Sequence, residues 1–139
     1  MGLILDTSAV IGLVERHSEA IEAVVAADPV RPVVSIISLG ELQHGLRRAA
    51  TARERRARQA TLDIVAELIA VGLSLAAAKG FGELSARLPR RVGVADRWIA
   101  ATALTRSLTL VTEDRELAEA LRGCDVPGRG AVEVVFVER

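Results

Sequence analysis

Short aliphatic runs alternate with longer amphipathic segments along the chain. Four runs of mostly Val, Ile and Leu predict β-strands at 3–5, 33–36, 108–111 and 132–137. A weaker fifth candidate, 71–75, is interrupted by Gly72 and resembles the end of a helix. Buried strands that alternate with helices are typical of a parallel sheet covered on both faces, so the pattern predicts an α/β fold.

The longer segments place apolar residues at helical spacing. One apolar stripe ends at Asp28-Pro29 and comprises Val10, Leu13, Val14, Ile21, Val24 and Val25. A second comprises Leu62, Val65, Leu68 and Ile69, and a third comprises Ile99, Ala103 and Leu104. No repeat, low-complexity tract or linker divides these segments. The 139 residues are therefore expected to form one domain, 1–139, with room for a core.

Composition excludes several classes of protein. Half of the residues are hydrophobic, yet no run approaches the ~18–20 apolar residues that a membrane span needs. No basic region precedes an apolar core at the N-terminus, so no secretory signal is expected. The one cysteine, Cys124, cannot form an internal disulfide, which fits a reducing compartment. We therefore expect a cytoplasmic protein without membrane contact.

Charge is balanced in total but uneven in its distribution. Eighteen basic residues stand against eighteen acidic ones, so net charge predicts no nucleic-acid partner. All basic residues except Lys79 are arginine, which binds phosphate through two hydrogen bonds, although a GC-rich genome would give the same bias. One segment is especially rich in them: Arg47, Arg48, Arg53, Arg55, Arg56 and Arg58. A phosphate contact, a solvated helix face and a contact with a protein partner all account for this cluster.

Four acidic residues share one expected location in the fold. Asp6 and Asp114 directly follow predicted strands, whereas Glu41 and Asp96 are expected to open helices. Parallel sheets bind ligands at the carboxyl ends of their strands, so all four acids are expected at one edge. Each acid alone is explained as a helix cap or as a favourable charge at a helix N-terminus. Four together repel one another and need a cation. Oxygen ligands without Cys or His at metal-ligand spacing favour Mg²⁺ or Mn²⁺ over zinc.

Four motifs follow one another in the order and spacing of a known family: DTSAVIGL, GELQHG, ADRWIAATAL and LVTEDREL. With them, essentially the whole chain resembles the PIN domain, and most closely the VapC-type toxins of bacterial toxin–antitoxin systems. The resemblance implies a three-layer α/β/α sandwich with a short central parallel sheet of four or five strands. It also implies the site: an acidic quartet at Asp6, Glu41, Asp96 and Asp114, with supporting hydroxyls at Thr112 and Ser8. Glu113 is an alternative that could share the role of Asp114.

The function that the resemblance implies is endoribonucleolytic hydrolysis with Mg²⁺ or Mn²⁺. An ion held by carboxylates lowers the pKa of a bound water, which attacks the phosphodiester. The expected partners are an RNA substrate (tRNA, rRNA or mRNA), a VapB-type antitoxin and a second copy of the chain in a homodimer. The candidate RNA contacts are Arg47, Arg48, Arg53 and His44. The alternative function is a catalytically weak PIN-like module that binds metal and RNA. A phosphatase of the haloacid-dehalogenase kind would need a second Asp where Ser8 stands.

Overall fold

Five short strands form one parallel sheet in the computed structural model, which describes residues 2–139. The strands are β1 (Leu3–Leu5), β2 (Val33–Ser35), β3 (Ile69–Val71), β4 (Thr109–Thr112) and β5 (Val134–Phe136). Their order across the sheet is β3-β2-β1-β4-β5, and all neighbours are parallel. The predicted α/β class with a short parallel sheet is confirmed. The chain leaves β1 first toward β3 and later returns toward β5, so β1 and β4 meet at the point where the direction reverses.

Two predicted strands end in different places, and serine caps are the reason in both cases. The run 33–36 loses Ile36 because the Ser35 side chain caps the next helix, which begins at Ile36. The weak candidate 71–75 was wrong, since the strand is Ile69–Val71 and the Ser74 side chain caps a helix that begins at Leu75. Leu75 is 89% exposed, so its apolar side chain wrongly suggested a buried strand.

Within residues 2–139, seven helices connect and cover the strands. They are α1 (Thr7–Val14), α2 (Glu19–Ala27), α3 (Ile36–Arg47), α4 (Ala52–Val65), α5 (Leu75–Ser85), α6 (Val94–Arg106) and α7 (Arg115–Arg122). Side chains cap the N-termini of all except α6; the capping residues are Asp6, Ser18, Ser35, Thr51, Ser74 and Asp114. Among residues 2–139, no helix has the length and apolar character that crossing a membrane requires.

The predicted apolar stripe from Val10 to Val25 belongs to two helices rather than one. The Ser18 side chain caps α2, and His17 has a left-handed backbone with φ 51°. His17 therefore lies between α1 and α2 and not inside a helix. The second predicted stripe is also divided, because α4 ends at Val65 and Ile69 lies in β3.

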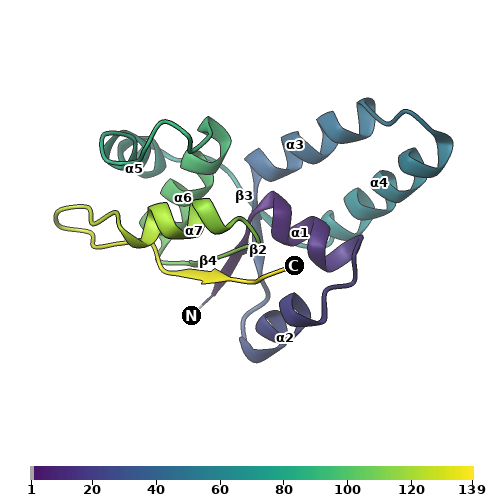
Figure 1. The fold of residues 1–139 in the computed structure, drawn as a ribbon, viewed down its shortest axis with the longest axis horizontal. Helices are drawn as coiled ribbons and strands as arrows, with labels where there is room; N and C mark the ends of the chain where they lie inside the picture. The colour runs from purple at the N-terminus through teal and green to yellow at the C-terminus, as the bar shows by residue number, and fades with distance from the viewer. Residues whose placement is uncertain (1) are drawn as a thin grey trace.

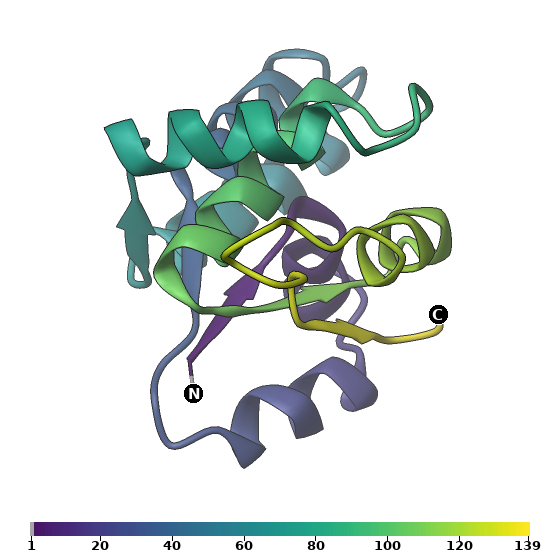
Figure 2. The same cartoon turned by 90° about the vertical axis from the view of Figure 1, so that its left-hand side faces the viewer.

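Helices cover both faces of the sheet, as the three-layer prediction required. Side chains alternate along the strands, so Ile4 and Leu110 face one core while Leu5, Val34 and Val111 face the other. The first core includes side chains of α5, α6 and α7, and the second includes side chains of α1 to α4. Figure 1 shows the two helix groups on opposite sides of the strands, and Figure 2 places α5 and α2 at opposite ends of the view.

Helices α3 and α4 form a hairpin that projects from the sheet (Figure 1). Its apolar contacts include Leu42, Leu46 and Leu62, which join the core under α1. The Arg58 guanidinium of α4 also donates a hydrogen bond to the backbone carbonyl of Gly45 in α3. The hairpin therefore has an apolar side against α1 and an arginine-rich exposed side on α4.

An ion pair with a buried carboxylate joins the segment after α1 to the residue after β4. The Glu113 side chain is 1% exposed and binds the Arg16 guanidinium through both carboxylate oxygens. Arg139 approaches the same carboxylate, with its Nε 3.5 Å from Oε1. Gly12 of α1 borders this contact: a Cβ there would lie 2.7 Å from Glu113 Oε2 and 2.6 Å from Ile21 Cδ1. The absence of a side chain at Gly12 lets α1 pack against both neighbours.

We predict that Gly12→Ala destabilises the protein, because the added methyl group displaces two buried side chains, Ile21 and Glu113. Overpacking of this kind costs about 1–3 kcal/mol in free energy of unfolding, which urea denaturation measures. Gly82→Ala in α5 is the control, since no atom lies within 4 Å of a Cβ at Gly82. It should leave stability unchanged or raise it by up to ~1 kcal/mol. Equal stability of the two variants would contradict the packing role of Gly12.

Candidate active site

Four elements bring the predicted acids to the carboxyl edge of the sheet. Asp6 follows β1 and Asp114 follows β4, and these two strands are paired neighbours. Asp96 lies in the first turn of α6, and Glu41 lies in α3. The three other carboxylates all raise the pKa of Asp96 by repulsion, so the four acids lie within electrostatic range of one another. Their catalytic role stays a prediction at this point.

Asp6 is a buried carboxylate with several hydrogen-bond donors. The Thr112 hydroxyl donates to Oδ2, the Ser8 hydroxyl donates to Oδ1 at 2.7 Å, and the Ala9 N–H donates to Oδ1 at 2.8 Å. Burial raises the pKa of Asp6, these hydrogen bonds lower it in part, and repulsion from Asp114 raises it further; the net direction is upward. The capping interpretation of Asp6 is confirmed, since its side chain caps α1.

The two predicted hydroxyls, Thr112 and Ser8, connect Asp6 to the turn that carries Asp114. The Asp114 N–H donates to Thr112 Oγ1 at 3.0 Å, and the Glu113 N–H donates to Ser8 Oγ at 3.1 Å. Each hydroxyl thus accepts from the β4–α7 turn and donates to Asp6. The hydroxyls fix the position of Asp6 relative to that turn.

Asp96 is a partly buried acid whose pKa is raised. Burial and repulsion from Asp6, Glu41 and Asp114 raise its pKa to about 6. Its neighbour Arg97 holds the preceding turn in place by donating to the carbonyls of Val92 at 2.9 Å, Pro89 at 2.8 Å and Ser85 at 3.3 Å. Sequence reasoning missed this arginine, because its partners are backbone carbonyls that no side-chain pattern reveals.

Glu41 does not open its helix, contrary to the prediction. Helix α3 begins at Ile36, directly after β2, and Glu41 lies near its middle. It stays close to the edge because Thr7, the first residue of α1, donates a hydrogen bond to Glu41 Oε1. Thr7 Oγ1 also lies 3.1 Å from Ser38 Oγ. Thr7 was not among the predicted site residues, although the DTS motif places it between two that were.

Asp114 and Glu113 are adjacent in sequence and have different surroundings. Asp114 is exposed and caps α7 by accepting from the Leu117 N–H at 3.1 Å. Glu113 is buried and bound by Arg16 and Arg139. Sharing the role of Asp114 would require Glu113 to break this ion pair, so the alternative at Glu113 has no support.

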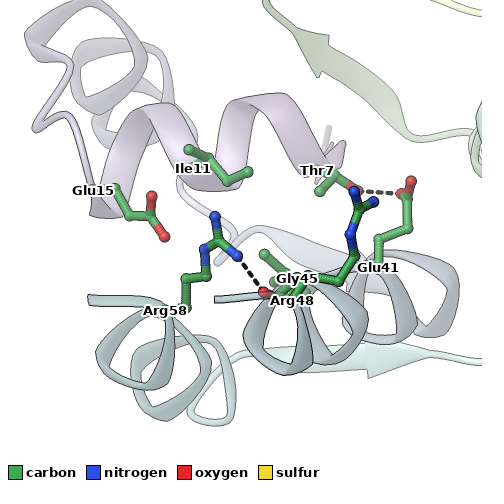
Figure 3. Close-up of a pocket in the computed structure, with 8 residues that line it drawn as sticks. Thr7, Ile11, Glu15, Glu41, Gly45, Arg48 and Arg58 are labelled. Atoms are coloured by element: carbon green, nitrogen blue, oxygen red, sulfur yellow. Dashed lines mark hydrogen bonds between the residues drawn. The ribbon is translucent and has the colours of Figure 1, made fainter. Parts of the chain in front are cut away.

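A cavity of about 450 Å³ opens beside Glu41, between α1, α3 and α4 (Figure 3). Its lining residues are Thr7, Ile11, Glu15, Glu41, Leu42, Gly45, Arg48 and Arg58. Of the predicted RNA contacts, only Arg48 is in this lining; Arg47, Arg53 and His44 are exposed and lie outside it. Arg58 also lines the cavity. It belongs to the arginine-rich segment but was not among the candidate RNA contacts.

The donor chemistry of the acidic edge fits a hard divalent cation. All candidate ligands are carboxylate or hydroxyl oxygens, and the repulsion that raises the pKa of Asp96 is what a cation relieves. Within residues 2–139, however, no three Asp, Glu, His or Cys side chains are gathered tightly enough to form a ready metal cage. The reason is local: hydrogen bonds hold Asp6 to Thr112, Glu41 to Thr7 and Asp114 to α7. The four carboxylates repel one another without meeting at a point.

Comparison with known proteins connects this fold and edge to a family. The family model for the PIN domain matches residues 3–122. Ribonuclease VapC5 of Mycobacterium tuberculosis is 34% identical over 137 residues, covering 96% of this chain and 94% of the relative. The crystal structure of VapBC-5, a toxin–antitoxin system of the same organism, matches with a TM-score of 0.76 and 32% identity over 98% of both chains. DNA-bound VapBC from Salmonella typhimurium matches with a TM-score of 0.75 and 25% identity over 98% of both chains. The chain belongs to the PIN-domain family and, within it, to the VapC ribonuclease toxins.

We predict that Asp96→Asn stabilises the metal-free protein at neutral pH. The pKa of Asp96 is about 6 in the folded protein and has the usual value of 3.8 when unfolded, so the folded state binds more protons between these values. Stability of the wild type therefore falls as pH rises through this window. The gain from Asp96→Asn should be ~1–2 kcal/mol larger at about pH 7.5 than at about pH 4, after allowance for the partial solvent exposure of Asp96.

Urea denaturation in EDTA at the two pH values measures this difference. Asp125→Asn, a change in an exposed aspartate after α7, is the control and should show no such pH dependence. An equal effect of Asp96→Asn at both pH values would argue against a charged, repelled carboxylate at this position.

Proposed function

We propose that the protein hydrolyses RNA phosphodiester bonds internally at the acidic edge, with Asp6, Glu41, Asp96 and Asp114 as catalytic and metal-binding residues. One observation carries this assignment: burial and three carboxylates from three other parts of the chain raise the pKa of Asp96 to about 6. Capping explains Asp6 and Asp114 individually, but it does not explain why Asp96 and Glu41 lie beside them. Clustered acids with raised pKa values are typical of functional sites.

The proposed metal is Mg²⁺ or Mn²⁺. Asp6, Asp96 and Asp114 are the residues that would hold it, with Glu41 as a fourth ligand. When bound, such an ion supplies Lewis-acid activation of the phosphodiester and of the attacking water. Support comes from the all-oxygen donor set and from membership of the PIN family.

The chain's own residues have distinct proposed roles. Thr112 and Ser8 orient the two oxygens of Asp6, and Thr7 orients Glu41. The N-termini of α1 and α7 meet the edge at Asp6 and Asp114, and α6 begins just before Asp96. Helix N-termini attract anions, so these three helices favour a phosphate at the edge despite the nearby carboxylates.

The proposed partner in the cell is an antitoxin of the VapB type, together with a second copy of the chain. Support for an antitoxin comes from the likeness to structures of toxin–antitoxin complexes. The physical basis is charge, because an edge with excess carboxylates attracts an inserted Arg or Lys of a partner. Such a side chain would compete with metal and RNA for the same acids.

We predict that Asp6→Asn, Glu41→Gln, Asp96→Asn and Asp114→Asn each lower RNA cleavage in Mn²⁺ at least ~100-fold, because a direct ligand should matter more than an outer partner. Thr112→Val removes an outer partner of Asp6 and should lower it by about 10–100-fold. Gel analysis of end-labelled RNA measures the rates, and circular dichroism shows that each variant is folded.

The control for these variants is Asp125→Asn, which should cleave at the wild-type rate. EDTA should abolish cleavage, and the products should carry 5′-phosphate and 3′-hydroxyl ends because water is the nucleophile. Cyclic phosphate ends, or activity that persists in EDTA, would refute the mechanism. A carboxylate variant with near-native turnover at saturating Mn²⁺ would remove that residue from the site.

We also predict that expression of the wild-type chain alone arrests bacterial growth, and that co-expression of its antitoxin restores growth. Asp6→Asn should allow normal growth without the antitoxin, because its RNA cleavage is lost while its fold and abundance are kept. Growth curves after induction measure the effect, and immunoblots check that both proteins accumulate equally. Equal arrest by wild type and Asp6→Asn would separate toxicity from the acidic edge.

A further inference from the structure

The cavity beside Glu41 extends away from the acids along two helices. On α1 its lining residues are Thr7, Ile11 and Glu15, which are spaced four residues apart and so share one helix face. Figure 3 shows Thr7 and Glu41 at one end and Glu15 at the other, with Arg58 across from Glu15. At 1.5 Å per residue, the distance from Thr7 to Glu15 is about 12 Å along the helix. The cavity is therefore an elongated pocket that begins at the acidic edge.

The walls of this pocket combine three kinds of chemistry. Ile11 and Leu42 give it an apolar surface, and Thr7 and Glu15 provide oxygen atoms. Two guanidinium groups line it as well: Arg48 directly follows α3, and Arg58 lies in α4. An apolar surface for a base, polar atoms for a sugar and guanidinium groups for a phosphate are what a nucleotide requires. The volume, about 450 Å³, lies within the range of about 300–1,000 Å³ for small-molecule sites.

The two arginines are held differently. Arg58 is half-buried and fixed in direction, because one of its nitrogen atoms donates to the Gly45 carbonyl on the pocket wall. Arg48 is exposed and forms no ion pair with any acid in the part of the chain that the structure describes. A phosphate at this position would meet one preoriented guanidinium and one that is able to move toward it.

Gly45 forms part of the pocket wall without filling it. A Cβ built at Gly45 meets no atom within 4 Å, and the residue lies in the middle of α3. Glycine in a helix interior costs about 0.5–1 kcal/mol relative to alanine, so its presence here is not explained by helix stability. The missing side chain keeps the pocket open next to Glu41.

We infer that this pocket binds the nucleotide next to the scissile bond, with its phosphate on Arg48 and Arg58; the inference rests on the proposed function. Glu41 belongs both to the acidic group and to the pocket lining. An RNA strand whose scissile phosphate lies at the acids therefore continues directly into the pocket. The ligand class is a single-stranded ribonucleotide segment, recognised by its backbone charge and by packing of one base.

The test fills the pocket and leaves all four acidic residues unchanged. Gly45→Leu places a branched side chain in the open space, whereas Gly82→Leu makes the same change at an exposed position of α5 where a Cβ also meets no atom. Cleavage of a fluorescein-labelled single-stranded RNA of mixed sequence and about 20 nucleotides is measured in Mn²⁺. Gly45→Leu should raise KM about tenfold or more with kcat nearly unchanged, because it removes binding that substrate and transition state share. Gly82→Leu should match the wild type.

A second pair of variants tests the phosphate contact and remains informative if Gly45→Leu does not fold. Arg48→Gln removes a charge from the pocket, and Arg47→Gln removes one from the adjacent position outside it. Binding of the same RNA is followed by anisotropy at several salt concentrations, in an Asp96→Asn background in which cleavage is expected to be at least ~100-fold slower. Arg48→Gln should reduce the slope of log Kd against log salt by about 0.7, the value for one phosphate of a single strand. Arg47→Gln should leave the slope unchanged.

The possible results separate this inference from the proposed function. Wild-type KM and kcat for a folded Gly45→Leu, or equal salt slopes for the two arginine variants, would overturn the pocket assignment while leaving cleavage at the acids intact. A third result would also overturn the pocket assignment: Gly45→Leu cleaves RNA as the wild type does, but the antitoxin no longer restores growth. The pocket would then bind a segment of the antitoxin and not RNA. Failure of the wild type to cleave any RNA would overturn the proposed function and this inference with it.

Discussion

The burial of negative charge at the carboxyl edge of the sheet is the constraint on which the rest of the structure depends. Asp6 ends the central strand and is only 2% exposed, so its carboxylate needs donors from the protein itself. Those donors come from the next helix and from the end of β4, 106 residues further along the chain. The same hydroxyl groups bond the backbone of the turn that leads into α7. Stabilising one carboxylate thus fixes the relative positions of β1, α1, β4 and α7, and those elements carry two of the four acids.

Glu113 and Asp96 show two opposite ways in which this fold accommodates a carboxylate. Glu113 receives a cation from the protein, since Arg16 in the segment after α1 binds it, and Gly12 leaves the space that this contact needs. Asp96 receives none from residues 2–139, and its burial and its acidic neighbours raise its pKa to about 6. A fold that only had to be stable would gain by pairing Asp96 in the way that it pairs Glu113. The unpaired group is consistent with a ligand that arrives from outside and is bound there.

The sequence predicts the parts of this structure that depend on local pattern. Alternating aliphatic runs and amphipathic segments identify the parallel sheet and its layers, and the strand ends place Asp6 and Asp114 at one edge. The pattern fails where a single capping serine decides, as at Ser18 and Ser74, because apolar spacing continues across these caps. It also fails for Thr7, Arg97 and the pocket, since these depend on contacts between helices far apart in sequence. The roles of Glu113 and Asp114 could be distinguished only from the structure, which shows that Arg16 binds Glu113.

The order of the strands determines when, during folding, the acidic edge is completed. The central strand β1 is synthesised first, yet one of its two neighbours, β4, begins more than a hundred residues later. Pairing across such a separation carries a large loop-closure entropy and is slow relative to local helix formation. Until β4 docks beside β1, Asp6 lacks the Thr112 hydroxyl that donates to one of its oxygens, and Asp114 is not held at the edge. The acidic edge is therefore completed only when β4 docks beside β1, which makes the site one of the last parts of the molecule to form.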